Sequence, residues 1–231
     1  MAFRSAMIRK CWPLLLACVL GVGIDVAIAA QAKSKSRLFA PLNLGLLEGP
    51  DREQWQRPDQ IMDALGIADG SIVADLGAGG GWFTTRLARR VGPNGLVYAE
   101  DIQPQMIEAI SRRVQREGLL NVVPALGTPS DPRLPAGIDA VLMVETYHEV
   151  EDPIALLKHV AQSLKPQGRI GVVEFTAGAG GPGPGPDERV DPQSVIQAAA
   201  SAGLELTKRE AVPPFQFLLV FEKDASSGAV R

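Results

Sequence analysis

An apolar run that ends in an acid and spaced glycines, at residues 73–81, most constrains how this chain can fold. The run reads Val-Ala-Asp-Leu-Gly-Ala-Gly-Gly-Gly and places Gly77, Gly79 and Gly81 directly after apolar residues. Glycine tolerates a positive φ and carries no Cβ, so the chain can turn sharply out of a β-strand and bring bare backbone close to a ligand. A helical pattern begins at Trp82, and its first N–H groups would face the same place. The sequence therefore predicts a strand–turn–helix unit at which an open α/β sheet binds a nucleotide-like ligand.

Apolar β-rich runs alternate with amphipathic patterns along the chain, which predicts parallel strands joined by crossover helices. Near the end, a helix that begins at Asp191-Pro192 is followed by two strands whose short connection makes them antiparallel. The predicted strands cover residues 71–76, 96–100, 122–126, 140–144, 169–175, 204–210 and 215–221, and the predicted helices before Asp191 cover residues 59–65, 82–91, 104–117 and 153–164.

The first 29 residues are predicted to be a secretory signal peptide. Basic residues precede an uncharged apolar run at residues 11–24, and Ala-Ile-Ala at 27–29 supplies small residues for cleavage. This pattern predicts a periplasmic or secreted protein. The apolar run is short for a membrane span, and an uncleaved segment over residues 11–30 that anchors the protein in a membrane is the alternative.

The 231 residues fit one domain with extensions. Residues 30–48 are predicted to be a linker, residues 49–223 the folded domain and residues 224–231 a flexible tail. Cys11 and Cys18 both lie in the signal segment, so the mature chain would hold no disulfide and no thiolate site. The formal net charge of −3 becomes more negative when the basic signal segment is removed, which makes nucleic acid an unsuitable partner.

The spacing of the glycines distinguishes between ligands. A dinucleotide fingerprint requires glycine at the sixth position of the turn, where this chain has Trp82. An indole there would obstruct the close packing that a pyrophosphate needs, which disfavours a nicotinamide oxidoreductase. The pattern Asp-x-Gly-x-Gly-x-Gly from Asp75 to Gly81 instead resembles the first motif of class I S-adenosylmethionine-dependent methyltransferases.

The resemblance extends over residues 49–223. Residues 164–170 are similar to the turn that precedes strand five in that family, and residues 137–142 are similar to its entry into strand four. The resemblance implies an α/β, doubly wound, mostly parallel seven-stranded sheet that ends in an antiparallel hairpin. It also implies S-adenosylmethionine as the cofactor and an exported enzyme that methylates a small-molecule acceptor, which the sequence does not identify.

The resemblance also implies where the cofactor binds. Asp101 ends the second predicted strand, where a carboxylate accepts hydrogen bonds from ribose hydroxyls. Asp131, in the loop after the third strand, is the candidate for the adenine amino group, although a proline-rich loop needs a turn residue there anyway. The predicted cofactor-binding residues are Asp75, Gly77, Gly79, Gly81, Asp101 and Asp131.

The loop after the fourth strand contains the predicted catalytic residues Glu145, Tyr147 and His148. A methyl transfer needs an aligned nucleophile, and a base if that nucleophile arrives protonated. Imidazole titrates near neutrality, so His148 is the candidate base, and its alternative role is to hydrogen-bond the loop. Tyr147 and Glu145 are predicted to orient the acceptor or shield the cation, whereas His159 is predicted to be a solvated bystander.

Other chemistries lack a matching pattern. No spacing typical of zinc or iron ligands is present, so no metal is predicted. The Gly- and Pro-rich residues 177–186 are predicted to be a solvated linker, with a lid over the site as the alternative. Because S-adenosylmethionine is made in the cytosol and the signal directs the chain elsewhere, an exported non-catalytic binding protein or sensor on the same fold is the rival hypothesis.

Overall fold

The computed structural model describes residues 38–178 and 180–225. The predicted signal peptide, the alternative anchor at residues 11–30, the first part of the predicted linker and residues 226–231 of the predicted tail lie outside the described residues. Within the described part of the chain, no helix combines the length and the apolar character needed to cross a membrane.

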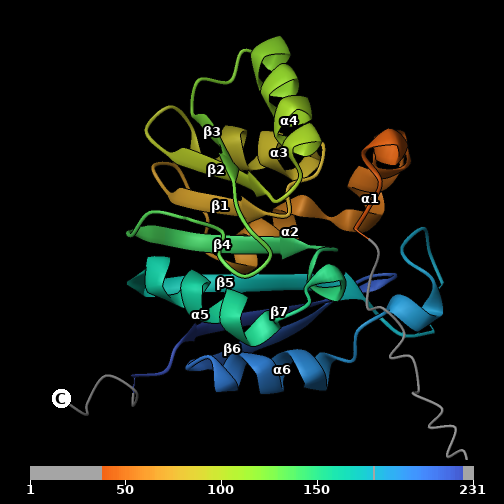
Figure 1. Ribbon diagram of the computed structural model, residues 1–231, viewed down its shortest axis with the longest axis vertical. Helices are drawn as coiled ribbons and strands as arrows, with labels where there is room; N and C mark the ends of the chain where they lie inside the picture. The colour runs from red at the N-terminus through yellow and green to blue at the C-terminus, as the bar shows by residue number, and fades with distance from the viewer. Residues whose placement is uncertain (1–37, 179, 226–231) are drawn as a thin grey trace, which may run out of the picture. The chain divides into compact units, whose positions relative to one another are not determined.

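A seven-stranded sheet in the order β3-β2-β1-β4-β5-β7-β6 forms the centre of the fold (Figure 1). Neighbouring strands from β3 to β5 pair in parallel, whereas β7 pairs antiparallel with both β5 and β6. The predicted doubly wound sheet with a closing antiparallel hairpin is therefore confirmed. The strands are β1 (Ile72–Leu76), β2 (Leu96–Asp101), β3 (Val122–Leu126), β4 (Ile138–Val144), β5 (Leu164–Phe175), β6 (Leu204–Val212) and β7 (Gln216–Lys223).

Helices cover both faces of the sheet, because alternate strand residues point to opposite faces and both faces are apolar. Ala74 and Val141 belong to the cluster that packs under α5 and α6, whereas Val73 and Leu142 belong to the cluster under α2 and α3 (Figure 1). The α-helices are α1 (Arg52–Gln56), α2 (Pro58–Ala64), α3 (Trp82–Val91), α4 (Pro104–Glu117), α5 (Pro153–Ser163) and α6 (Pro192–Ser201), and the 3₁₀ helices are η1 (Pro41–Leu47), η2 (Tyr147–Glu149) and η3 (Pro186–Glu188).

Local signals set the ends of these helices. The Asp152 carboxylate accepts a hydrogen bond from the Ala155 N–H at 3.0 Å and so caps α5, which begins with a proline. Asp191 caps α6 in the same way. Gly118 ends α4 in the left-handed conformation that glycine adopts readily.

The structure differs from the prediction around residues 164–168. These residues were expected to form the turn before strand five, but they belong to β5 itself. Leu164 pairs with Ile138 across a register shift, so the start of β5 is fixed by its neighbour β4. The carboxyl ends of β1, β2, β4 and β5 all lie at one edge of the sheet, which is where ligands of open α/β sheets bind.

Candidate active site

A cavity of about 470 Å³ opens at the carboxyl ends of β1, β2 and β4. The structure brings most of the predicted site residues together in its wall. Those that line it are Asp75, Gly77, Gly79, Asp101, Glu145 and His148. The cavity is also lined by residues that the sequence analysis did not single out, among them Phe39, Leu47, Arg52, Glu100, Gln103, Thr146 and Pro182.

The glycine turn after β1 forms one end of the cavity. Gly77, Gly79 and Gly81 have φ values of 71°, 56° and 80°, which L side chains rarely adopt. A Cβ at Gly77 would also overlap the side chain of Thr146, whose hydroxyl lies 3.4 Å from the Gly77 carbonyl oxygen. Gly81 does not line the cavity and instead caps the N-terminus of α3. Bare backbone is therefore a structural requirement of this turn.

Two buried acids, Asp75 and Glu100, lie next to the turn. Asp75 accepts a hydrogen bond from the Thr84 hydroxyl at 2.6 Å, and burial raises the pKa of Asp75 to about 6. Burial and the charge of Asp101 raise the pKa of Glu100 to about 8, so this carboxyl is mostly protonated at neutral pH. One Glu100 oxygen accepts a hydrogen bond from the Gly77 N–H at 3.4 Å.

Asp101 lies where the ribose-binding acid was predicted. Its carboxylate lines the cavity and accepts hydrogen bonds from the N–H of Gly79 at 3.0 Å and the N–H of Gln103 at 2.9 Å. Burial raises the pKa of Asp101 above its usual value, although these hydrogen bonds oppose the rise. The side chain thus joins the glycine turn to the end of β2, and its contact with a ribose stays a prediction.

Part of the predicted linker belongs to the cavity wall. We call residues 38–48 the N-terminal strap, because this segment reaches from the loop after β2 to the loop after β4. The Phe39 N–H donates to the Glu149 carboxylate at 3.3 Å, and the Phe39 carbonyl accepts from the Gln103 amide at 3.1 Å. Glu48 forms an ion pair with Arg113 at 2.6 Å. The sequence pattern missed this role because the strap's partners lie far along the chain.

Beside the glycine turn, where the Thr146 side chain approaches Gly77, Glu145 follows β4 with a φ of 56° and is held by a chain of buried polar groups. Its carboxylate accepts a hydrogen bond from Gln216 at 2.8 Å, Gln216 accepts one from Gln56 at 2.6 Å, and Gln56 accepts from Arg52 at 3.2 Å. Burial raises the pKa of Glu145, while the Arg52 charge opposes the rise. No local motif marks Arg52, Gln56 or Gln216.

His148 lies in the same loop after β4, within η2, and lines the cavity. Its Nδ1 atom is 3.0 Å from a carboxylate oxygen of Glu174, which is fully buried at the end of β5. Tyr147, the neighbouring predicted residue, is buried in the apolar cluster of the α5 and α6 face and does not line the cavity. Burial raises the pKa of Tyr147 to about 12, so its hydroxyl stays protonated. Of these two predicted residues, the structure places only His148 at the cavity.

The structure does not bring Asp131 to the cavity. Its carboxylate accepts a hydrogen bond from the Arg133 N–H at 2.8 Å and so closes its own turn, while Thr128 and Pro129 line the cavity from this loop. His159 is exposed and lies 2.8 Å from the Ser130 carbonyl oxygen. The adenine contact of Asp131 stays a prediction, and the position of Asp131 in the structure does not support it.

The Gly- and Pro-rich loop borders the cavity through residues 182–184. Arg189 donates hydrogen bonds to the carbonyl oxygens of Thr176, Gly180 and Pro184, and so ties the described part of the loop to the end of β5. The loop is therefore more than a solvated linker, because part of it forms cavity wall. Trp55 packs against Phe175 and Phe215, with ring centroids 5.8 Å and 6.2 Å away.

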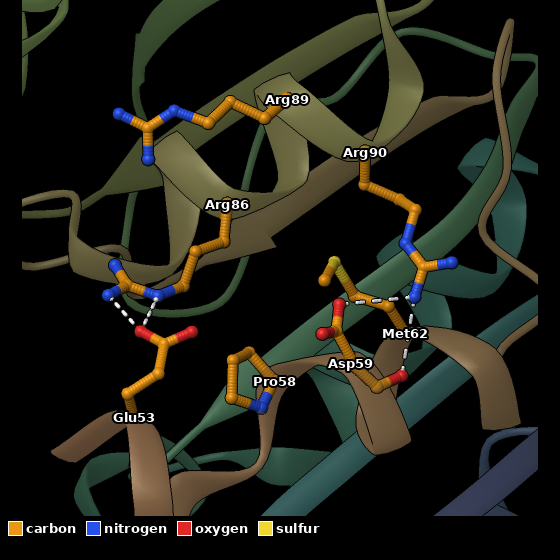
Figure 2. A pocket seen from close by; sticks show the side chains of 7 residues that line it. All are labelled: Glu53, Pro58, Asp59, Met62, Arg86, Arg89 and Arg90. Atoms are coloured by element: carbon orange, nitrogen blue, oxygen red, sulfur yellow. Dashed lines mark hydrogen bonds and ion pairs between the residues drawn. The ribbon is translucent and has the colours of Figure 1, made fainter.

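A second, more open hollow of about 370 Å³ lies between α2 and α3 (Figure 2). Its arginines are paired with acids: Arg86 with Glu53, and Arg90 with Asp59 (Figure 2). The hollow contains no glycine turn, and its third arginine, Arg89, pairs with Glu117 outside the hollow, so each of its arginines already has an acidic partner. Among the described residues, no group of three or more potential metal ligands gathers at either place. The larger cavity is thus the candidate active site.

Comparisons with known proteins agree with this geometry. Residues 73–168 match the family model described as a methyltransferase domain. An uncharacterized methyltransferase of Mycobacterium tuberculosis is 37% identical over 141 residues, which are 60% of this chain and 54% of that protein. Nocamycin O-methyltransferase of Saccharothrix syringae is 33% identical over 114 residues, which are 49% of this chain and 41% of that protein. The chain spans about half the length of the curated relatives that it matches.

The fold also matches solved structures. A crystal structure of an S-adenosylmethionine-dependent methyltransferase from Aquifex aeolicus superposes with a TM-score of 0.76 and 26% identity, over 79% of this chain and 98% of that chain. The sheet order and the cavity define the Rossmann-like methyltransferase fold. The family model, the relatives, the sheet order and the cavity together identify residues 73–168 as a class I methyltransferase domain. S-adenosylmethionine is the cofactor of this class.

The residues of the cavity fit that cofactor. The backbone at Gly79 and Gly80 lines the cavity without a side chain, which suits the close approach of an amino-acid tail, and the Asp101 carboxylate at the end of β2 suits hydroxyl groups. Acidic side chains outnumber basic ones in the wall, where Arg52 and His148 supply the basic groups among the described residues. Such a wall suits a cofactor that carries a positive sulfonium.

Proposed function

We propose that the protein is an S-adenosylmethionine-dependent methyltransferase that transfers a methyl group to a small-molecule acceptor. The glycine turn and Asp101 would hold the cofactor at one end of the cavity, and the groups around His148 and Glu145 would receive the acceptor at the other. The name of the Saccharothrix relative, nocamycin O-methyltransferase, supports this acceptor class.

One observation carries the proposal: a single cavity of about 470 Å³ has the glycine turn in its wall together with a histidine from the loop after β4. The cofactor supplies a methyl group that reacts with an aligned nucleophile. Catalysis of such a step needs the reacting groups held close together, and a base within reach if the nucleophile is protonated. The cavity combines a place for the cofactor with a titratable group.

Calorimetry on the full chain tests the binding step. We expect saturable binding of S-adenosylmethionine and of its demethylated product. As a matched control, Asp59→Ala in the hollow between α2 and α3 should leave both affinities unchanged, because Asp59 does not line the active-site cavity. Absence of binding by the wild-type protein would refute the proposal at its first step.

Methyl transfer is tested separately with labelled cofactor and a small-molecule extract. Incorporation of label into a low-mass product supports the enzyme. Binding without any transfer would instead favour the non-catalytic binding protein or sensor, which has the same fold but no turnover. The two assays therefore separate the two hypotheses.

We also propose that residues 1–29 direct export to the periplasm or the medium and are then removed. The basic start, the apolar run and the small residues at 27–29 support this proposal. N-terminal sequencing of the protein recovered from each cell fraction tests it. A protein that keeps its first residues and stays in the membrane fraction would favour the anchor at residues 11–30.

A further inference from the structure

Glu174 is a fully buried carboxylate that faces the imidazole of His148 at the acceptor end of the cavity. We propose that Glu174 is a positioning residue that fixes His148 as the proton acceptor for a substrate hydroxyl group, so that the acceptor is an enol or a phenol. This inference rests on the proposed function, because it names the substrate class of the same site.

The geometry fixes the tautomer of the imidazole. His148 Nδ1 lies 3.2 Å and 3.0 Å from the two oxygens of Glu174, and the backbone N–H of His148 donates to the same carboxylate at 3.2 Å. An ionised carboxylate only accepts hydrogen bonds, so Nδ1 must carry the proton. The lone pair of the neutral ring is then on Nε2, which is the nitrogen left for a molecule in the cavity.

Burial of the Glu174 carboxylate is unfavourable unless His148 compensates it. Removing a carboxylate from water costs several kcal/mol unless hydrogen bonds and a nearby positive charge offset the loss. Within the described chain, all the hydrogen bonds that Glu174 accepts come from His148. The carboxylate therefore has the imidazole as its partner, and it becomes better compensated when the imidazole gains a proton.

The charges around the imidazole favour its protonated form. Burial by itself lowers the pKa of His148, but the hydrogen bond and charge of Glu174, with the charges of Glu149 and Glu145, together raise it above the usual value. Glu174 comes from β5, Glu149 from η2 and Glu145 from the end of β4. The Nε2 atom lies 3.9 Å from a Glu149 oxygen. His148 is thus a stronger base than a free imidazole.

This arrangement selects an acceptor that arrives with a proton to lose. In the step, the acceptor O–H proton moves to His148 Nε2, and the oxygen electron pair forms the bond to the methyl carbon. The carbon–sulfur bond breaks with its electrons on sulfur, and the imidazolium then releases its proton to water. A thiol, whose pKa is about 8.5, is already partly ionised near neutrality and needs less help from a base than an enol or phenol, and the acidic wall would hold an amine as its ammonium. An enol or phenol hydroxyl therefore fits the pair best.

Nuclear magnetic resonance tests the pair without any acceptor, because the chain has two histidines. In full-length His159→Gln, the remaining imidazole signals belong to His148. We expect nitrogen shifts that show the neutral ring protonated on Nδ1, and a His148 pKa above the ordinary value of an imidazole. Glu174→Gln should lower the His148 pKa by about one unit or more, because it removes the paired charge.

Glu149→Gln is the matched control, since it removes one carboxylate near Nε2 instead of Nδ1. We expect a smaller fall in the His148 pKa and an unchanged tautomer. Wild-type protein with the neutral ring protonated on Nε2 would overturn the inference, and that measurement does not depend on any variant folding. Equal pKa changes in Glu174→Gln and Glu149→Gln, with both variants folded, would overturn it as well.

Turnover provides the second readout. The transfer rate should rise with pH to a plateau, with a midpoint at the His148 pKa, and this midpoint should fall in Glu174→Gln while the cofactor affinity stays unchanged. Mass spectrometry should place the label on oxygen, and a product methylated on nitrogen or sulfur overturns the acceptor class. If cofactor binding fails while the resonance data hold, the proposed function is wrong but the positioning of His148 stands.

Discussion

The parts of the active-site cavity that we assign to the cofactor and to the acceptor, which we call the cofactor end and the acceptor end, are built in different ways. At the cofactor end, the turn after β1 is held by Asp101 and Glu100, which lie on the next strand in the chain, and backbone N–H groups are the main donors. At the acceptor end, side chains that are distant in sequence hold one another, as Gln56 holds Gln216 and His148 faces Glu174. The cofactor end thus depends on backbone conformation and the acceptor end on side-chain identity.

This difference teaches which changes each end tolerates. A turn that requires positive φ values accepts little besides glycine, so the cofactor end is restricted by the backbone itself. We assign to the acceptor end η2, the loop at residues 182–184 and the ends of β5 and β7, where loops and side chains can vary while the backbone of the turn is kept. A common cofactor and varied acceptors are what such a division permits.

Gly77→Val should have the largest effect at the cofactor end. Valine would need a left-handed φ and would overlap Thr146, so we expect cofactor affinity to fall at least about 100-fold. Calorimetry measures the affinity, and thermal unfolding reports any loss of fold. Gly118→Val is the matched control: Gly118 also has a positive φ, but nothing surrounds it, so stability should fall without loss of affinity. Equal loss of affinity in both variants would contradict the role of the turn.

His148→Ala should have the next largest effect, and it should act at the other end. We expect methyl transfer to fall about 10²- to 10⁴-fold, the usual contribution of a general base, while cofactor affinity is retained. Rate measurements with labelled cofactor and calorimetry on the same sample separate the two quantities. His159→Ala should leave both unchanged, because His159 is exposed and outside the cavity. Loss of cofactor affinity in His148→Ala would contradict the assignment of His148 to the acceptor end.

The order and type of the structural elements were predictable because their signals are local. Strand β3 and helices α3 and α4 have the predicted ends, since proline starts α4 and glycine residues end both helices. The start of β5 was not predictable in this way. Leu164 extends because it pairs with Ile138, and that pairing depends on a strand elsewhere in the chain.

The same distinction applies to the candidate site. Gly77 and Gly79 follow the apolar strand β1, and Asp101 is the last residue of β2, so their patterns indicated the cavity. Arg52 and Gln216 had no local signal, because their network joins α1 to β7. Glu174 did have one: it is an acid within the apolar end of a strand at the ligand-binding edge, and this position could have indicated a buried functional carboxylate.

A comparison of two acids sharpens the limits of the cofactor end. Asp101→Ala should weaken cofactor binding about 10- to 100-fold, as expected for the loss of a charged hydrogen-bonding partner. Asp131→Ala should have a much smaller effect, because its carboxylate closes its own turn and does not line the cavity. Calorimetry on both variants measures the difference. If Asp131→Ala proves the more harmful change, the predicted adenine contact is restored and the cofactor end reaches further than the cavity wall suggests.

The last expected effect is on stability instead of cofactor affinity, and it concerns Glu100, whose buried carboxyl accepts a hydrogen bond from the Gly77 N–H of the glycine turn. Its pKa is raised to about 8 in the folded chain from an ordinary value of 4.5, so between these pH values the folded chain holds a proton that the unfolded chain has lost. Stability from this group is therefore lost as pH rises through that window, by at most about 1.4 kcal/mol per pH unit. Glu100→Gln removes this dependence, and its thermal midpoint should rise relative to the wild type as pH increases from 5 to 8. In the exposed Glu205→Gln, the thermal midpoint should not change relative to the wild type as pH increases. If Glu100→Gln and Glu205→Gln show the same pH dependence relative to the wild type, Glu100 is ionised in the folded chain and the prediction is wrong.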